Sequence, residues 1–109
     1  MRKKVISYMG LAKKAGRLVS GTNTCAFAMK KGKAGLVILA EDISENGEKK
    51  IMKEINRYGT KFVKYGSSEE LSRAVGSQGR SVFAVCDGNF AEVIFEEIDR
   101  ERSEGGKRI

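Results

Sequence analysis

Several side chains that small enzymes depend on are missing or scarce in this chain. Its 109 residues include no histidine and no tryptophan, and only two cysteines. Without histidine there is no histidine general base, no serine–histidine or cysteine–histidine pair and no imidazole metal ligand. Cys25 and Cys86 lack the CxxC spacing of a zinc ribbon, so we expect two buried free thiols in a reducing compartment. We therefore expect neither a catalytic site nor a metal or other cofactor.

Long hydrophobic runs are also lacking. The longest apolar stretches, residues 35–40 and 82–86, are far shorter than the ~20 residues that cross a bilayer, and the basic start precedes no long apolar segment. We expect a cytoplasmic protein with no membrane partner. The chain length allows one domain. We place it at residues 1–102, followed by a flexible tail at 103–109 that contains Gly105-Gly106.

Acidic residues are absent from the first 40 positions, which hold nine basic ones, although the whole chain carries 14 Asp and Glu against 21 Lys and Arg. A long basic stretch without carboxylates indicates a phosphate-bearing partner, because ordinary solvated faces mix both signs. A basic membrane-surface helix is the competing interpretation, but it needs apolar residues that the core requires. We therefore expect nucleic acid as the partner.

Helical and strand-like segments alternate along the chain. Hydrophobic spacing and capping residues predict helices over 3–15, from 21–24 to 31, over 44–58, from 67 to 75 and from 87–89 onward, with a core stripe of Phe90, Val93, Ile94 and Ile98. Strands are predicted over 17–20, 36–40, 62–65 and 81–86. This alternation predicts an α/β fold, a three-layer αβα sandwich with one central mixed sheet of four or five strands.

Three segments carry candidate chemistry. Residues 21–24 open a helix, where free backbone N–H groups attract anions, an Asn or Thr can cap the helix and Asn23 can read a base edge. The loop 76–81 supplies flexible backbone and the Arg80 guanidinium. Glu41-Asp42 follows a buried strand without an evident third metal ligand, so a structural role is favoured over catalysis. Four phenylalanines fall where core is expected, which predicts no base-stacking sheet: Phe27, Phe62, Phe83 and Phe90.

Taken in order, several motifs resemble one known family. They are Gly21-x-Asn23 at the start of a basic helix, residues 32–42 (GKAGLVILAED), residues 68–74 (SEELSRA) and a final Ala84-Val85-x-Asp87. This order is similar to that of the kink-turn-binding ribosomal proteins of the archaeal and eukaryotic large subunit, over roughly residues 3–98. The opening segment 10–21 (GLAKKAGRLVSG) resembles the bacterial YlxQ-like branch.

The resemblance implies a non-catalytic αβα protein that recognises or stabilises structured RNA, ribosomal or from another ribonucleoprotein. In that family a helix-start loop reads sheared G·A pairs, and two further loops enclose a flipped-out base. We also expect the protein to be a monomer. Carried over by position, the G·A contacts would come from Gly21, Thr22, Asn23 and Thr24. One pocket wall would come from Glu41, Asp42 and Ile43, and the other from Gln78, Gly79, Arg80 and Ser81. Phosphate contacts would come from Lys13, Lys14, Arg17 and Lys33.

Three positions depart from the family pattern. Thr24 stands where a Glu or Gln is usual, Phe27 where a Lys is usual, and Val19-Ser20 where a basic pair is usual. The residues alone leave a second class open, a small α/β protein-interaction module or a nucleotide-using enzyme. An enzyme would need a pocket with a nucleophile or base, and an interaction module would need an exposed apolar patch.

Overall fold

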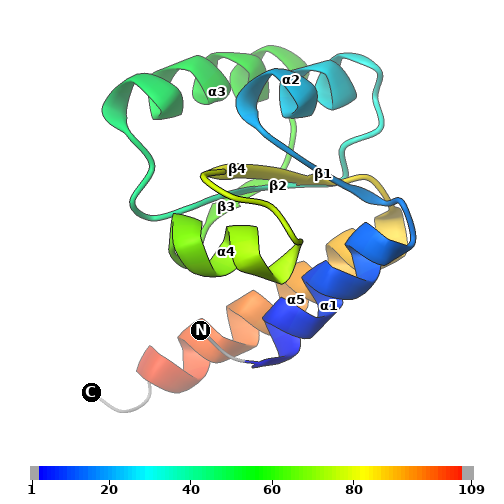
Figure 1. Ribbon diagram of the computed structural model, residues 1–109, viewed down its shortest axis with the longest axis vertical. Coiled ribbons are helices and arrows are strands. Elements are labelled where there is room, and N and C mark those ends of the chain that lie inside the picture. Colours follow the sequence, from blue (N-terminus) through cyan, green and yellow to red (C-terminus); the bar gives the residue numbers. More distant parts are fainter. Residues whose placement is uncertain (1–2, 107–109) are drawn as a thin grey trace.

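A computed structural model of the chain describes residues 3–106 and has three layers (Figure 1). The helices and strands alternate as predicted. In chain order they are α1 (Lys3–Lys14), β1 (Leu18–Ser20), α2 (Thr22–Lys30), β2 (Leu36–Leu39), α3 (Glu45–Tyr58), β3 (Phe62–Lys64), α4 (Ser68–Ala74), β4 (Val82–Val85) and α5 (Gly88–Gly106).

The four strands form one mixed sheet in the order β1-β4-β2-β3. Strand β2 runs parallel to β3, whereas β4 runs antiparallel to both of its neighbours, β1 and β2. Every residue of the two central strands, β2 and β4, is buried, as expected for strands covered by helices on both faces. The predicted α/β class with a mixed sheet is confirmed, and the sheet has four strands.

Alternate residues of the two central strands, β2 and β4, pack into two separate layers of core. Leu36 and Ile38 of β2 pack with α1, α4 and α5, while Val37 and Leu39 pack with α2 and α3. Figure 1 shows α2 and α3 together on one face of the sheet and the other three helices on the opposite face. The alternation follows from the two-residue period of a strand, which sends neighbouring side chains to opposite faces.

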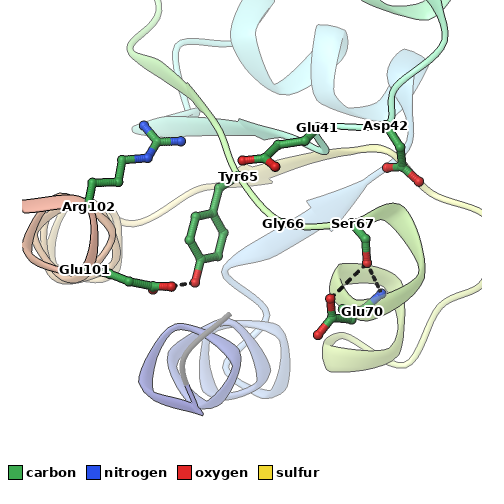
Figure 2. Close-up of a pocket in the computed structure, with 8 residues that line it drawn as sticks. All are labelled: Glu41, Asp42, Tyr65, Gly66, Ser67, Glu70, Glu101 and Arg102. Atoms are coloured by element: carbon green, nitrogen blue, oxygen red, sulfur yellow. Dashed lines mark hydrogen bonds between the residues drawn. The ribbon is translucent and has the colours of Figure 1, made fainter. Parts of the chain in front are cut away.

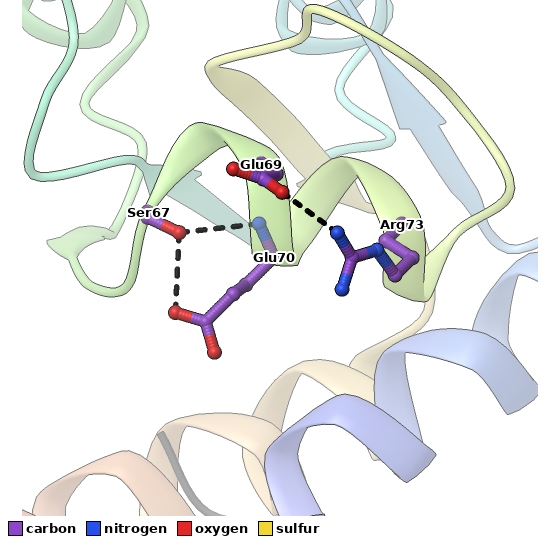
Figure 3. Close-up of polar contacts among 4 residues, drawn as sticks. All are labelled: Ser67, Glu69, Glu70 and Arg73. Atoms are coloured by element: carbon purple, nitrogen blue, oxygen red, sulfur yellow. Dashed lines mark hydrogen bonds and ion pairs between the residues drawn. The ribbon is translucent and has the colours of Figure 1, made fainter.

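Two helix starts follow the capping rules that the sequence suggested. The Ser44 side chain accepts a hydrogen bond from the backbone N–H of Gly47 at the start of α3. At the start of α4, the Ser67 hydroxyl accepts from the Glu70 backbone N–H at 3.1 Å and contacts the Glu70 carboxylate at 3.2 Å (Figure 3). The same view shows the ion pair of Arg73 with Glu69 one turn away. These local bonds fix where α3 and α4 begin.

The structure corrects the expected core at three positions. Phe27 is 60% exposed, Phe62 is 42% exposed and Val93 is 39% exposed. The buried face of α2 is formed by Cys25, Ala28 and Met29. Residue 27 lies about 200° around the helix from residue 25, so its side chain points away from that face. Phe62 begins β3, which is an edge strand and therefore lacks a neighbour on one side.

Helix α5 extends into the segment that we predicted as a flexible tail, residues 103–109. Residues 103–106 belong to this helix, which ends at Gly106. The remaining tail residues, 107–109, lie outside the described part of the chain. Within residues 3–106, no helix is both long and apolar enough to cross a membrane.

Candidate nucleic-acid interface

Helix α2 begins at a glycine and not at a capping side chain. We expected an Asn or Thr of the 21–24 segment to cap it, but the N-cap is Gly21, with φ 98° and ψ 146°. This region of backbone space is almost restricted to glycine, because a Cβ atom would clash there. The N–H groups of the first turn therefore have no N-cap side chain and can bind an anion or a carbonyl oxygen. Thr22 is half-buried, and Asn23 and Thr24 are exposed.

The Arg80 guanidinium lies directly against Gly21. A Cβ atom built on Gly21 would lie 3.0 Å from Nη1 of Arg80 and 3.6 Å from its Cζ. Ser72 of α4, which is only 2% exposed, holds the backbone of Arg80 at both polar groups. Its hydroxyl accepts from the Arg80 N–H and donates to the Arg80 carbonyl, each at 2.9 Å. The buried Ser72 therefore fixes the backbone of Arg80, whose guanidinium faces the start of α2 from the loop between α4 and β4.

Three loops meet around a small cavity of about 160 Å³ beside this pair. They are the loop between β1 and α2, the loop between β2 and α3, and the loop between α4 and β4. Six of the predicted site residues line this cavity: Gly21, Thr22, Ile43, Gly79, Arg80 and Ser81. The cavity thus has an apolar wall at Ile43 and a cationic wall at Arg80.

Sequence reasoning missed three lining residues, Ser44, Gly47 and Val82. A Cβ atom on Gly47 would lie 2.9 Å from the Ser44 hydroxyl and 3.5 Å from Cγ1 of Ile43. Glycine in the first turns of a helix costs about 1 kcal/mol relative to alanine, so its presence there was a readable signal of close packing. Ser72 carried a comparable signal, as a hydroxyl between Leu71 and Val75 on the buried face of α4.

Asp42 organises the loops and does not line the cavity beside Gly21. Its carboxylate accepts from the backbone N–H and from the hydroxyl of Ser68, both at 2.8 Å. The Ser68 hydroxyl also lies 2.7 Å from that of Ser81, so one chain of hydrogen bonds joins three segments. The hydrogen bonds from Ser68 lower the pKa of Asp42 below its usual value, because they stabilise the charged form.

Glu41 and Gln78 also lie outside that cavity, contrary to the expected placement. Glu41 and Asp42 line a larger cavity of about 620 Å³ with Tyr65, Glu70 and Glu101 (Figure 2). The Tyr65 hydroxyl donates a hydrogen bond of 2.6 Å to the Glu101 carboxylate, and Figure 2 shows both side chains at this cavity. Gln78 lines a third cavity beside α4. The acidic pair therefore faces away from the Gly21 side of its loop.

The predicted phosphate contacts lie at the opposite end of the sheet. Strand β1 begins just after Arg17 and ends just before Gly21, and it pairs with β4 so that Leu18 lies opposite Val85 and Ser20 opposite Phe83. Arg17 therefore lies beside the end of β4, where its carbonyl accepts from the Cys86 N–H. Three exposed lysines lie at this same end, two in the last turn of α1 and one just before β2: Lys13, Lys14 and Lys33. The candidate site residues thus form two groups separated by the length of the sheet (Figure 1).

Both cysteines are free thiols, as expected, but only Cys25 is fully buried. Burial raises the pKa of Cys25 to about 12, and burial also raises that of the half-buried Cys86. In the described part of the chain, no group of three His, Cys, Asp or Glu side chains is placed to hold a metal ion. The cavity beside Gly21 is lined by hydroxyls, backbone, the Arg80 guanidinium and the apolar side chains of Ile43 and Val82.

This arrangement, an αβα domain with three loops around an uncapped helix start, defines the class of protein. A sequence profile of the ribosomal protein L7Ae/L30e/S12e/Gadd45 family matches residues 3–95, and the chain belongs to that family, in its YlxQ-like branch. It is 35% identical over 91 residues to RNA-binding protein YlxQ of Bacillus subtilis (strain 168), covering 84% of this chain and 91% of that one. The Enterococcus faecium protein of the same name is 32% identical over 98 residues, which cover 90% and 94% of the two chains.

Two solved structures share the fold of this chain. A Bacillus halodurans protein described as of unknown function superposes with a TM-score of 0.83 at 31% identity, over 90% of this chain and 99% of that one. The Giardia lamblia 15.5kD RNA binding protein superposes with a TM-score of 0.71 over 92% of each chain. Its identity is 20%, so that likeness concerns the fold alone.

Proposed function

We propose that this chain is a non-catalytic RNA-binding protein that recognises or stabilises a kink-turn or bulged RNA, ribosomal or from another ribonucleoprotein, and that it binds as a monomer. The observation that carries the proposal is the meeting of Arg80, Ile43 and the uncapped start of α2 around one cavity. The relatives named as RNA-binding proteins and the carboxylate-free first 40 residues support the same partner.

Each group has a role that its chemistry suits. The N–H groups of the first turn of α2, together with the Asn23 amide, meet the polar edges of guanine bases. The Arg80 guanidinium contacts a phosphate or a base acceptor from the other side. Ile43 packs against an unstacked base, which needs an apolar surface once it leaves the helix. Asp42 keeps the second and third loops together and so shapes the cavity.

The double variant Asn23→Ala/Arg80→Ala tests this assignment. Both side chains are exposed, so the variant should fold as the wild type does while its Kd for a kink-turn RNA rises about 100-fold or more. The matched control is Asn56→Ala/Arg57→Ala, which removes the same two residue types from the last turn of α3. The RNA affinity of this control should stay within about threefold of wild type, because it loses only one positive charge that lies away from the proposed site. Equal affinities for the two double variants would contradict the proposed site.

A further inference from the structure

The exposed face of α2 carries an aromatic ring between polar and basic side chains. The exposed positions of the helix and its C-cap are Asn23, Thr24, Phe27, Lys30 and Lys31. Phe27 is the most exposed of the large hydrophobic side chains in residues 3–106, at 60%. The Lys31 ammonium lies 5.3 Å from the centre of its ring, within the range of a cation–π contact. The ring is therefore held in a cationic setting and is open to solvent.

Helix α2 also joins the two groups into which the candidate site divides. Its first turn borders the cavity at Gly21, and its last turn leads to Lys33 at the opposite end of the sheet (Figure 1). Its nine residues span about 13 Å, and Phe27 lies one turn from Asn23 and one turn from Lys31. A strand of RNA that leaves the cavity along this helix would pass over the ring before it reaches the lysines.

The charge around the ring favours RNA over a protein as its occupant. No Asp or Glu occurs within residues 1–40, so α2 and the segments before and after it offer cations without carboxylates. A planar ring flanked by lysines suits a nucleobase and its neighbouring phosphates, since stacking uses the face of the base and tolerates any sequence.

We propose that Phe27 stacks on an unpaired nucleobase of the RNA held at the start of α2, and that Lys30 and Lys31 contact the phosphates beside it. This stacking proposal rests on the proposed function and extends it. At position 27 the family pattern has a lysine, which offers a charge, whereas this chain has a phenylalanine, which offers an aromatic ring. The exposed face of α2 would then add affinity for RNA that has an unpaired nucleotide at this place, and the type of base would matter little.

Fluorescence can test this directly, since the chain contains no tryptophan. Phe27→Trp would introduce a single indole at the proposed contact, and Phe62→Trp a matched indole on β3, which is 42% exposed and on the sheet edge. On titration with a kink-turn RNA that has an unpaired bulge, the emission of Phe27→Trp should be quenched as complex forms. The emission of Phe62→Trp should stay unchanged while that protein binds with wild-type affinity.

Affinity gives an independent readout. Phe27→Leu keeps an apolar side chain but removes the ring, and its Kd should rise about 5- to 100-fold, whereas Phe62→Leu should bind as wild type does. Unquenched Phe27→Trp together with wild-type affinity of Phe27→Leu would overturn the stacking proposal and leave the RNA-binding function intact, with Phe27 open to another protein. A wild-type protein that fails to bind the RNA would overturn the proposed function itself.

Discussion

Removal of the Ser72 hydroxyl should loosen the loop that carries Arg80. In the folded chain this hydroxyl makes two hydrogen bonds of 2.9 Å to the backbone of Arg80, from a side chain that is 2% exposed. Each such bond contributes about 0.5–1.5 kcal/mol net, so Ser72→Ala loses about 1–3 kcal/mol. Alanine is a better helix former than serine by about 0.5 kcal/mol, which offsets part of that loss.

Ser7→Ala is the matched control, since Ser7 is exposed in the middle of α1 and gains the same helix propensity without losing these bonds. Relative to this control, Ser72→Ala should melt roughly 4–24 °C lower, at the 4–8 °C per kcal/mol typical of a domain of this size. Differential scanning calorimetry of the two variants measures the difference directly.

RNA affinity supplies the functional half of the same prediction. At 25 °C the Ser72→Ala protein remains folded, so any loss of affinity reports the cost of ordering the Arg80 loop on binding. That cost is about 0.5–1.5 kcal/mol for an immobilised side chain, which corresponds to a Kd about 2- to 12-fold higher. Equal melting temperature and equal affinity of Ser72→Ala and Ser7→Ala would refute the role given to this hydroxyl.

Three further predictions concern a glycine, an aspartate and the thiols. Gly21→Ala should destabilise the fold by about 1–2 kcal/mol and also weaken RNA binding. Gly32→Ala, where φ is 71° but the space around the residue is open, should destabilise the fold and leave RNA binding unchanged. Urea unfolding measures the stability of each variant, and RNA titration measures its affinity. Folding lowers the pKa of Asp42, so its carboxylate stabilises the fold fully above about pH 4 and ceases to do so as the pH falls through the lowered pKa. The difference in free energy of unfolding between wild type and Asp42→Asn, measured by urea unfolding, should therefore disappear in acid. At pH 7 a thiol reagent should modify Cys86 before Cys25, as peptide mass spectrometry would show; prior labelling of Cys25 would contradict its burial.

The order of elements was predictable because each boundary has a local cause. Ser44 and Gly59 bound α3, and the pairing of Ser67 with Glu70 starts α4; each of these cap contacts joins residues only three or four positions apart. The mixed sheet followed from short strands between helices. Local sequence carried less information about α2, where the buried face is built from Cys25, Ala28 and Met29, so the largest apolar residue in the helix was mistaken for core.

Placement of the site residues was only partly predictable. The family pattern links three loops, and the residues that it predicts on them, Gly21, Ile43 and Arg80, line one cavity in the structure. The lysines and Arg17 near Gly21 in sequence lie at the other end of the sheet, because the direction of β1 and its register with β4 decide the end at which a neighbouring residue lies. The sequence pattern of a single segment does not reveal the direction of a strand or its register with a neighbour.

The most direct test of the account is a titration of the wild-type protein with a kink-turn RNA and with the same RNA after replacement of its G·A pairs, each at two salt concentrations. The account predicts tighter binding of the intact kink-turn at both, with log K falling against log salt by about 0.7–0.9 for every phosphate neutralised. Equal affinity for the two RNAs, or an affinity that salt does not change, would contradict it.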